Sequence, residues 1–501
     1  MPVVNFGTRV PTPLVANRTG IASPRPPFPQ ADIYFFNLLY YIHAATGKMV
    51  PTGVTQNVVR NSGATASRSQ RRARSGREGL IGDEGLSGKG SNSVKLRHYN
   101  ERFVLDAIRR LKEASKSDLA RAAHLTPAAV ADIVDGLEAA GFVKQVGKRF
   151  GQRGSPSVLY RLMPERIYSV GIKIGRRALE AVLVDFAGEL RARESHEYRY
   201  PDPELVRKAG NTSLANFDAL VNGLDDASMV GVGIASPFFL GGWIEELGFP
   251  ADLGDRWDAI ELMTHFTTPT KVPVFIENDA TSAALAELVL GAGARFHDFM
   301  HISIDTFVGG GLVQGGKVQP GPHGNSAALG PIPVSPSSLD SAAAKPGRYP
   351  SLLHRASIYV LVNHLKSRGI EITRVRELDP MPSGAREPLN EWIEDCANAL
   401  VEAIIAIASV VDIEAIVLDS ILPRSIHLEL LAKVQSQFSR VRATGIVAPE
   451  IVPGQFGPEA SPIGAAMLPF SALLAPDSSV LMIGKDRTRL LGKLSALAGQ
   501  S

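Results

Sequence analysis

Hydrophobic residues begin to recur at helical spacing near residue 100, and three short amphipathic segments follow in quick succession. The first segment carries apolar side chains three or four positions apart, at Phe103, Val104, Ala107, Ile108 and Leu111. This spacing predicts a helix, with Asn100 as its N-cap. Ser115 followed by Asp118 predicts a capping box that opens a second helix. Thr126-Pro127 supplies a cap and a first-turn proline for a third helix, which we expect to end at Gly141.

Two strand-like segments follow the third helix, Phe142 to Val146 and Val158 to Leu162, and they flank a glycine-rich basic loop. Three helices followed by a two-stranded wing predict a winged helix-turn-helix domain. In such domains the third helix enters the major groove of DNA, and the wing reaches the backbone or the minor groove. A generic helical bundle is one alternative, but it leaves the wing unexplained. Another is that the third helix binds a protein.

The candidate DNA contacts come from the start of the third helix and from the wing. They are Thr126, Ala128, Ala129, Asp132, Lys148, Arg149, Gln152 and Arg153. The helix offers few long hydrogen-bonding side chains, so base readout is expected to depend on thymine methyl groups, on water or on groove shape. The predicted partner is a double-stranded DNA operator.

From Ile167 onward, strand-like and helical segments alternate, which is typical of α/β architecture. The first two strand-like segments, Ile167 to Ile174 and Ala178 to Asp185, predict a hairpin. Further buried strands are predicted at Val230 to Ala235, Val274 to Ile276, Met300 to Ile304 and Ile416 to Leu418. Long helical patterns occupy Ala280 to Leu290, Leu353 to Ser367 and Leu389 to Ser409.

Charge divides the chain at the same place as the hydrophobic pattern. Residues 1–165 hold 24 Lys and Arg against 12 Asp and Glu, whereas residues 166–501 hold 29 against 38. A basic front end favours binding of a polyanion, with a merely solvated basic tail as the alternative. Residues 1–90 are rich in Pro, Gly, Ser and Arg and are predicted to be disordered. We therefore expect a disordered extension at 1–90, the DNA-binding domain at 91–165 and the α/β body at 166–501.

The single cysteine, Cys396, excludes an intramolecular disulfide and a thiolate cluster for zinc, which fits a reducing cytoplasm. The most apolar N-terminal run, Ile33 to Ile42, is too short to span a bilayer. It also lacks the basic flank of a secretory signal. We therefore expect a cytoplasmic protein that does not bind membranes.

The turn of the hairpin carries cations where a nucleotide-hydrolysing hairpin needs other residues. A phosphate-binding turn requires an acidic residue for Mg²⁺ and small residues that let backbone N–H groups approach phosphate. The run GIKIGRR, Gly171 to Arg177, places Lys173, Arg176 and Arg177 there instead. Direct binding of an anion by these side chains is left open.

Asn278 and Asp279 stand at the mouth of a predicted strand, directly before a helix. A carboxylate held there can accept a proton from an alcohol, and the carboxamide can bind a sugar hydroxyl. Capping of the following helix is the alternative, because Asn and Asp are favoured capping residues.

Several runs together resemble the ROK family of sugar-responsive bacterial repressors and sugar kinases, over roughly residues 95–470. These are the GQRGSPS wing, GIKIGRR, the SPF loop at Ser236, FIENDATSAALAE and the segment from Gly309 to Gly330. The resemblance implies a two-lobed body with an actin-like, hexokinase-like fold. By the match to kinase members, Asp279 takes the position of the catalytic base and Asn278 that of a sugar contact.

The same resemblance assigns Lys173 to the position of the hairpin Asp that family kinases use around ATP phosphates and Mg²⁺. Arg176 and Arg177 replace a Gly-Thr pair. The second phosphate-binding run, GTGIG in the family, reads Asp305-Thr-Phe-Val-Gly309 here, so Phe307 replaces a glycine. A misplaced charge at about 4 Å is worth roughly 4 kcal/mol at an effective dielectric near 20, which argues against Mg²⁺-nucleotide binding.

Two later runs also depart from the family pattern. The GEIGH run, whose Glu and His touch the sugar and whose His can bind zinc, falls on Ala327 to Pro331. The adenosine-side Gly-Gly falls on Asp419-Ser420. We therefore expect no cofactor, no metal and no catalysis, with Asp279 as a vestigial base.

Three functions fit these patterns. The first is a DNA-binding regulator, a repressor, whose body senses a carbohydrate-like effector beside Asn278 and Asp279 and which forms at least a homodimer. The second is a sugar kinase that has kept a DNA-binding module. The third is an architectural or constitutive DNA-binding protein whose body only dimerises.

Overall fold

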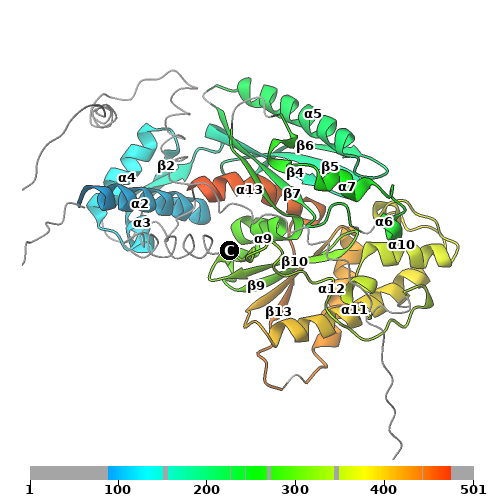
Figure 1. Ribbon diagram of the computed structural model, residues 1–501. Coiled ribbons are helices and arrows are strands. Elements are labelled where there is room, and N and C mark those ends of the chain that lie inside the picture. Colours follow the sequence, from blue (N-terminus) through cyan, green and yellow to red (C-terminus); the bar gives the residue numbers. More distant parts are fainter. Residues whose placement is uncertain are drawn as a thin grey trace, which may run out of the picture.

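The computed structural model describes residues 89–150, 156–225, 227–242, 244–267, 272–342, 349–442 and 444–474. An N-terminal unit of three helices lies beside a larger body, in which two five-stranded sheets are stacked with helices between them (Figure 1). The extension predicted at residues 1–90 falls almost entirely outside the described residues.

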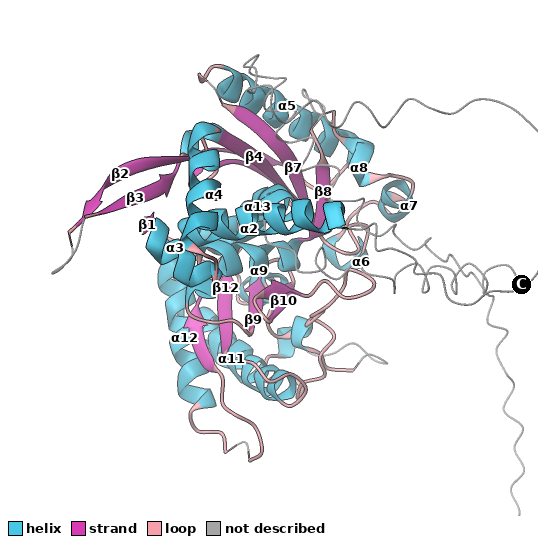
Figure 2. Cartoon of the chain, turned by 90° about the vertical axis from the view of Figure 1, so that its left-hand side faces the viewer, coloured by secondary structure: helices cyan, strands magenta, loops and turns pink. Residues whose placement is uncertain are grey.

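The N-terminal unit joins three helices to a small antiparallel sheet of order β1-β3-β2. Its elements are α2 (Lys89–Leu111), β1 (Ala114–Ser115), α3 (Lys116–Ala123), α4 (Pro127–Ala139), β2 (Val143–Arg149) and β3 (Ser157–Leu162). β2 and β3 extend away from the helices as a ribbon (Figure 2).

Local signals place the starts of α3 and α4 as predicted. The Ser115 hydroxyl accepts from the Asp118 amide at 3.2 Å, and the Ser115 amide donates to the Asp118 carboxylate at 3.0 Å. Burial opposes ionisation of Asp118, but the hydrogen bonds from Ser115 and Arg121 and the charge of Arg149 together outweigh it and lower the pKa of that carboxyl to about 2. Thr126 accepts from the Ala129 amide at 3.3 Å at the start of α4. Gly141, at φ +77°, follows the end of α4 as expected.

The predicted start of the first helix was wrong. α2 begins at Lys89, and Asn100 lies inside it. The pair Arg97–Glu101, with Nε and Oε1 2.9 Å apart, spans the turn at Asn100 and supports the helix there.

The first lobe of the body is built on a sheet of order β6-β5-β4-β7-β8. β4, β7 and β8 run parallel, whereas β5 and β6 are antiparallel to their neighbours. The strands are β4 (Ile167–Ile174), β5 (Ala178–Asp185), β6 (Leu190–Glu197), β7 (Ser228–Ser236) and β8 (Val274–Asn278). The helices are α5 (Pro203–Asn222), α6 (Ile244–Leu247), α7 (Leu253–Asp258), α8 (Leu262–His265) and α9 (Asp279–Leu290).

The second lobe repeats this plan with the order β11-β10-β9-β12-β13. β9, β12 and β13 are parallel, and β10 and β11 are antiparallel. The strands are β9 (Phe299–Ile304), β10 (Val308–Gln314), β11 (Lys317–Val318), β12 (Ala415–Ser420) and β13 (Glu450–Pro453). The helices of this lobe are α10 (Ile358–Ser367), α11 (Arg386–Ala408) and α12 (Arg424–Phe438). The last helix, α13 (Ala460–Leu474), packs on β4, β5, β7 and β8 of the first sheet.

The predicted strands and long helices are present, with one error at a helix start. The helix expected from Leu353 begins at Ile358, because Ser357 is extended and its hydroxyl caps the Val360 amide at 3.3 Å. Strands β6, β10 and β13 and helices α5, α12 and α13 were not predicted.

Helices α9 and α13 lie side by side between the two sheets (Figures 1 and 2). The approach of α13 to the first sheet is close enough to require glycine in the sheet. A Cβ at Gly233 would lie 1.8 Å from the Ala465 carbonyl oxygen, and one at Gly171 would lie 2.0 Å from that of Pro462. Both predicted strands therefore carry glycine for packing.

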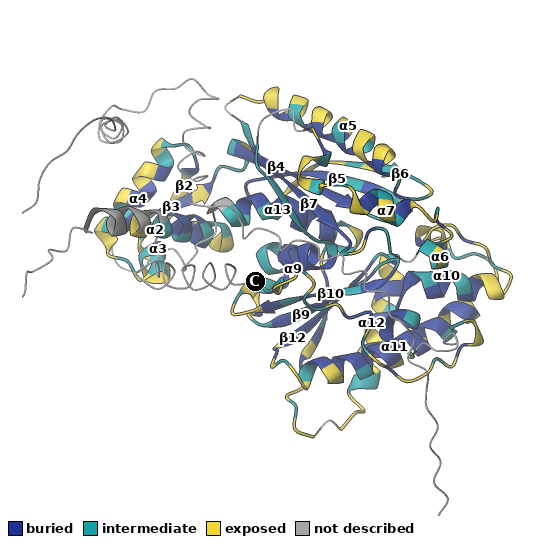
Figure 3. Ribbon diagram, in the orientation of Figure 1, coloured by how far each residue is buried: buried dark blue, intermediate teal, exposed yellow. Residues whose placement is uncertain are grey.

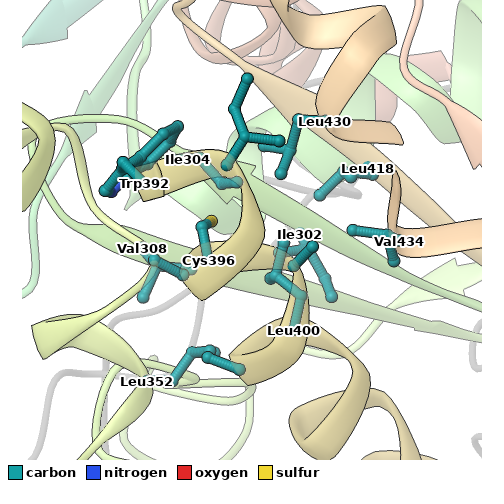
Figure 4. Packing of buried hydrophobic residues seen from close by; sticks show 14 of the residues in the cluster. Ile302, Ile304, Val308, Leu352, Trp392, Cys396, Leu400, Leu418, Leu430 and Val434 are labelled. Carbon is teal, nitrogen blue, oxygen red and sulfur yellow. The ribbon is translucent and has the colours of Figure 1, made fainter. Parts of the chain in front are cut away.

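Buried residues follow the sheets and the helix faces turned toward them (Figure 3). In the second lobe, Cys396 on α11 is fully buried among aliphatic side chains that include Ile302, Val308 and Leu400 (Figure 4). Burial raises the pKa of the Cys396 thiol, so the thiol behaves as a small apolar group. None of the helices in the described part of the chain is both long and apolar enough to cross a bilayer.

Candidate functional site

The parallel strands of the first lobe bring the three candidate runs to one edge of the sheet. Lys173 on β4 pairs in register with Ala235 on β7, and Ser236 at the end of β7 pairs with Asn278 on β8. The hairpin turn, the SPF loop and the start of α9 therefore meet at the carboxyl ends of these strands. This is the edge where ligands bind in open α/β sheets.

Lys173 reaches across from the first lobe to the second. Its ammonium group forms an ion pair and hydrogen bond with Asp305, which follows β9, and only 11% of the lysine side chain is exposed. Burial lowers the pKa of Lys173, but the charges of Asp305 and Asp279 outweigh it and raise that pKa. Burial likewise opposes ionisation of Asp305, yet Lys173 holds the pKa of that carboxyl below its ordinary value. The pair is therefore ionised and joins the two lobes.

The two arginines of the turn lie on aromatic rings. The Arg176 guanidinium is 4.8 Å from the ring centroid of Phe307, in the second lobe, and that of Arg177 is 5.0 Å from the ring of Phe249. Arg177 also donates to the Arg199 carbonyl oxygen. Burial lowers the pKa of Arg176, and its Nε makes no hydrogen bond with any described residue. The turn thus contacts the opposite lobe through both Lys173 and Arg176.

Asn278 and Asp279 form the first turn of α9. The Asn278 side-chain oxygen accepts from the Ala280 and Thr281 amides at 3.0 and 3.2 Å, which is the capping role considered as the alternative. Asp279 accepts from the Ala280 amide at 2.9 Å. Burial raises the pKa of Asp279, and Lys173 and Arg176 partly offset that rise. The charges of Lys173 and Arg176 therefore act on the Asp279 carboxyl group.

The glycine cluster of β10 packs against α9. A Cβ at Gly311 would lie 2.4 Å from the Ala284 Cβ and 2.9 Å from the Ala280 carbonyl oxygen, and one at Gly309 would lie 3.0 Å from the Ala280 Cβ. Gly309, the last residue of the second phosphate-binding run, and Gly311 thus let a strand of the second lobe approach α9 closely.

Replacing Gly311 with alanine should therefore lower the free energy of unfolding by about 1–3 kcal/mol, because the strand must move away from α9. Gly136→Ala is the matched control, since a Cβ at this position in α4 meets nothing within 4 Å. The control should stabilise by about 0.5–1 kcal/mol. Urea denaturation checks both changes, and equal effects would contradict the packing role.

The segment Ala327 to Pro331 leads into a loop that a buried carboxylate holds in place. Asp395 on α11 accepts from the Ser337 hydroxyl at 2.9 Å and from the Ser338 amide at 3.0 Å. The Arg355 guanidinium donates to both oxygens of Asp395, at 2.8 and 3.1 Å. No signal in the sequence marked Arg355 or Asp395. Among the residues that the structure describes, no group of three or more His, Cys, Asp or Glu side chains is placed to hold a metal ion.

Asp419 and Ser420 are buried at the end of β12 rather than open toward a ligand. Asp419 accepts from the Gly457 amide at 3.0 Å, and its carboxylate lies 3.9 Å from Nε2 of the fully buried His301. Ser420 and Nδ1 of His427 lie 2.9 Å apart. Sequence reasoning missed His301 and His427, because each lies in an otherwise ordinary strand or helix.

The described candidate DNA contacts lie at the start of α4 and at the end of β2. Thr126, Ala128 and Asp132 are exposed and Ala129 is half-buried on the first turns of α4. The exposed Arg149 donates to Asp118 at 2.9 Å, whereas Lys148 is exposed beside it on β2. Gln152 and Arg153 lie outside the described residues.

Comparison with known proteins matches the ROK family model to residues 169–471. The chain belongs to the ROK family. This ROK protein is 27% identical over 378 residues to the uncharacterized protein y4fQ of Sinorhizobium fredii, which covers 74% of the chain and 90% of that relative. It is 23% identical to the xylose repressor of Bacillus spizizenii, over 48% of the chain and 61% of the repressor, so this match spans under two thirds of the repressor.

One solved structure extends the comparison to the fold. The ROK family transcriptional regulator described as a homolog of the E. coli MLC protein aligns with 77% of the chain at 19% identity, with a TM-score of 0.54. The expected actin-like, hexokinase-type fold of the body is confirmed.

Proposed function

We propose that this ROK protein is a DNA-binding transcriptional regulator, a repressor, whose body binds a carbohydrate-type ligand without phosphorylating it. The order helix, short strand, two helices and a β-ribbon, with β1 closing the sheet, supports a winged helix-turn-helix assignment for residues 89–162. The exposed first turn of α4 and the basic end of β2 then face DNA. This arrangement is the observation that carries the proposal.

Footprinting of the DNA upstream of the protein's own gene tests it. A protected site of specific sequence should withstand an excess of unrelated duplex DNA, because specific contacts exceed the salt-dependent attraction to phosphates. Uniform weak binding to every fragment would reject sequence-specific regulation and favour an architectural role.

Lys148→Ala should weaken binding to all duplexes alike and reduce the slope of log K against log salt by about 1, because one phosphate contact is lost. Fluorescence anisotropy at several salt concentrations measures the slope. Lys433→Ala on α12 removes the same charge far from the wing and serves as the control. An unchanged slope in Lys148→Ala would show that the wing is not part of the DNA interface.

We infer from the ion pair between Lys173 and Asp305 that the protein does not phosphorylate its ligand. An ammonium group bound to a carboxylate occupies the turn that a Mg²⁺-nucleotide would have to reach. Asp279 at the start of α9 is the observation that favours the alternative, a sugar kinase. A coupled assay with ATP and a panel of sugars distinguishes the two functions. ATP turnover that disappears in Asp279→Asn would establish that the protein is a sugar kinase.

The proposed ligand lies beside Asn278 and Asp279, and its binding shifts the equilibrium between DNA-bound and released homodimers. Thermal-shift screening of sugars, sugar acids and sugar phosphates tests this part. A ligand that binds only the folded protein raises its Tm, whereas a body that only dimerises gives no shift. Sugar phosphates also probe whether Lys173 and Arg176 bind an anion.

A further inference from the structure

Helix α9 connects the candidate ligand site to the N-terminal unit. Its first turn carries Asn278 and Asp279. Near its other end, the Val289 carbonyl oxygen accepts a hydrogen bond of 2.5 Å from Nη1 of Arg109 on α2. Twelve residues of α-helix span about 18 Å, so one rigid element reaches both places.

Arg109 is held in a fixed orientation. Its Nη2 pairs with Asp106 at 2.5 Å on the preceding turn of α2, and only 16% of its side chain is exposed. The neighbouring Arg110 also pairs with Asp106, at 2.8 Å, but is 55% exposed. Of these two arginines, Arg109 is thus the one that links α2 to the end of α9.

The N-terminal unit and the body share one hydrophobic cluster around this link. The Phe142 ring lies 5.9 Å from the Phe186 ring of the body, which lies 5.9 Å from Phe470 of α13. Leu288 and Leu290 of α9 pack against the same cluster. A displacement of the end of α9 therefore acts on a packed interface and not on a free linker.

Close backbone packing also ties α9 to both neighbours inside the body. A Cβ at Gly464 of α13 would lie 1.7 Å from the Ser282 carbonyl oxygen, and β10 of the second lobe touches α9 at Gly311. Because these surfaces leave no room to slide, a change in the angle between the lobes must displace α9 or break its contacts.

We propose that α9 transmits the state of the candidate ligand site to the DNA-binding unit, and that Arg109 is the positioning residue that couples them. The inference rests on the proposed function. A shift of α9 moves the Val289 carbonyl, the fixed guanidinium follows it, and α2 changes the orientation of the unit that carries α4. Such coupling requires two distinct sites and one structural element that contacts both of them.

A double-mutant cycle tests the coupling without an identified effector. Asn278→Ala removes the cap of α9 and perturbs its ligand end. Anisotropy on the footprinted operator should show a change in Kd of about fivefold or more for Asn278→Ala in the wild-type background and in Arg110→Ala. In the Arg109→Ala background the change should fall below about twofold. An equal change in all three backgrounds, or no change in the wild-type background, would overturn the proposal.

Hydrogen exchange separates this inference from the proposed function. Asn278→Ala should alter exchange of the α2 amides from Phe103 to Leu111 in the wild-type background and in Arg110→Ala, but not in Arg109→Ala. If no variant binds DNA specifically and this exchange pattern is present, the regulator assignment fails while the coupling stands. If operator binding is specific and exchange in α2 does not respond, the coupling fails.

Discussion

Asp395→Ala should lower the free energy of unfolding by about 3–5 kcal/mol, the cost of leaving a buried charge without its partner. Asp395 is fully buried and the Arg355 side chain is 5% exposed, so solvent cannot replace the lost carboxylate. The loop at Ser337 and Ser338 loses its anchor on α11 in the same step. Urea denaturation followed by circular dichroism measures the loss.

Glu394→Ala is the matched control. The neighbouring Glu394 lies on the same helix and pairs with Lys433, but half of its side chain is exposed, so its removal should cost no more than about 1 kcal/mol. Equal losses of unfolding free energy for the two variants would show that removing any charge from α11 has the same cost. The buried pair would then stabilise the protein no more than the exposed one.

Lys173→Met should lower the free energy of unfolding at pH 7 by about 2–4 kcal/mol. Methionine keeps the apolar stem but leaves Asp305 and Asp279 without the ammonium group. The expected loss is below that for Asp395 because 27% of the Asp305 side chain is exposed and water can partly solvate it. Urea denaturation at pH 7 measures the change, with Lys208→Met on the exposed side of α5 as the control.

The effect of Lys173→Met should depend on pH in one direction. The pKa of Asp305 is lowered in the folded wild-type protein, so its stabilisation is present above the unfolded pKa, near 3.9, and is lost as pH falls through the folded value. The difference between variant and wild type should therefore shrink under acidic conditions. A difference that grows on acidification would contradict an ionised pair.

Much of the architecture could be predicted because its signals are local. The Ser115 capping box and the Thr126-Pro127 start are each contained within four residues, and the hairpin strands have continuous apolar runs. Asn278 was recognisable as a capping residue for the same reason. The strand β6 was missed because it has no continuous apolar run. Exposed and half-buried positions alternate along it, and many of its residues are charged, which is the pattern of an edge strand.

The contacts between the two lobes could not be predicted. Lys173 and Asp305 are 132 positions apart and meet only because the two lobes face each other. Lys173 alone suggested the loss of a phosphate-binding group, and Asp305 was not singled out. Together they form a pair of opposite charges. Arg355 and Asp395 form a second pair of this kind.

The position of α13 has a consequence for synthesis of the protein. Met467 and Phe470 of α13 belong to the same hydrophobic cluster as the core of the N-terminal unit. Roughly 300 residues separate the end of β3 from these side chains, so at 5–20 residues per second a ribosome needs roughly 15–60 s to supply them. During translation the N-terminal unit therefore lacks part of the hydrophobic surface on which it packs in the complete chain.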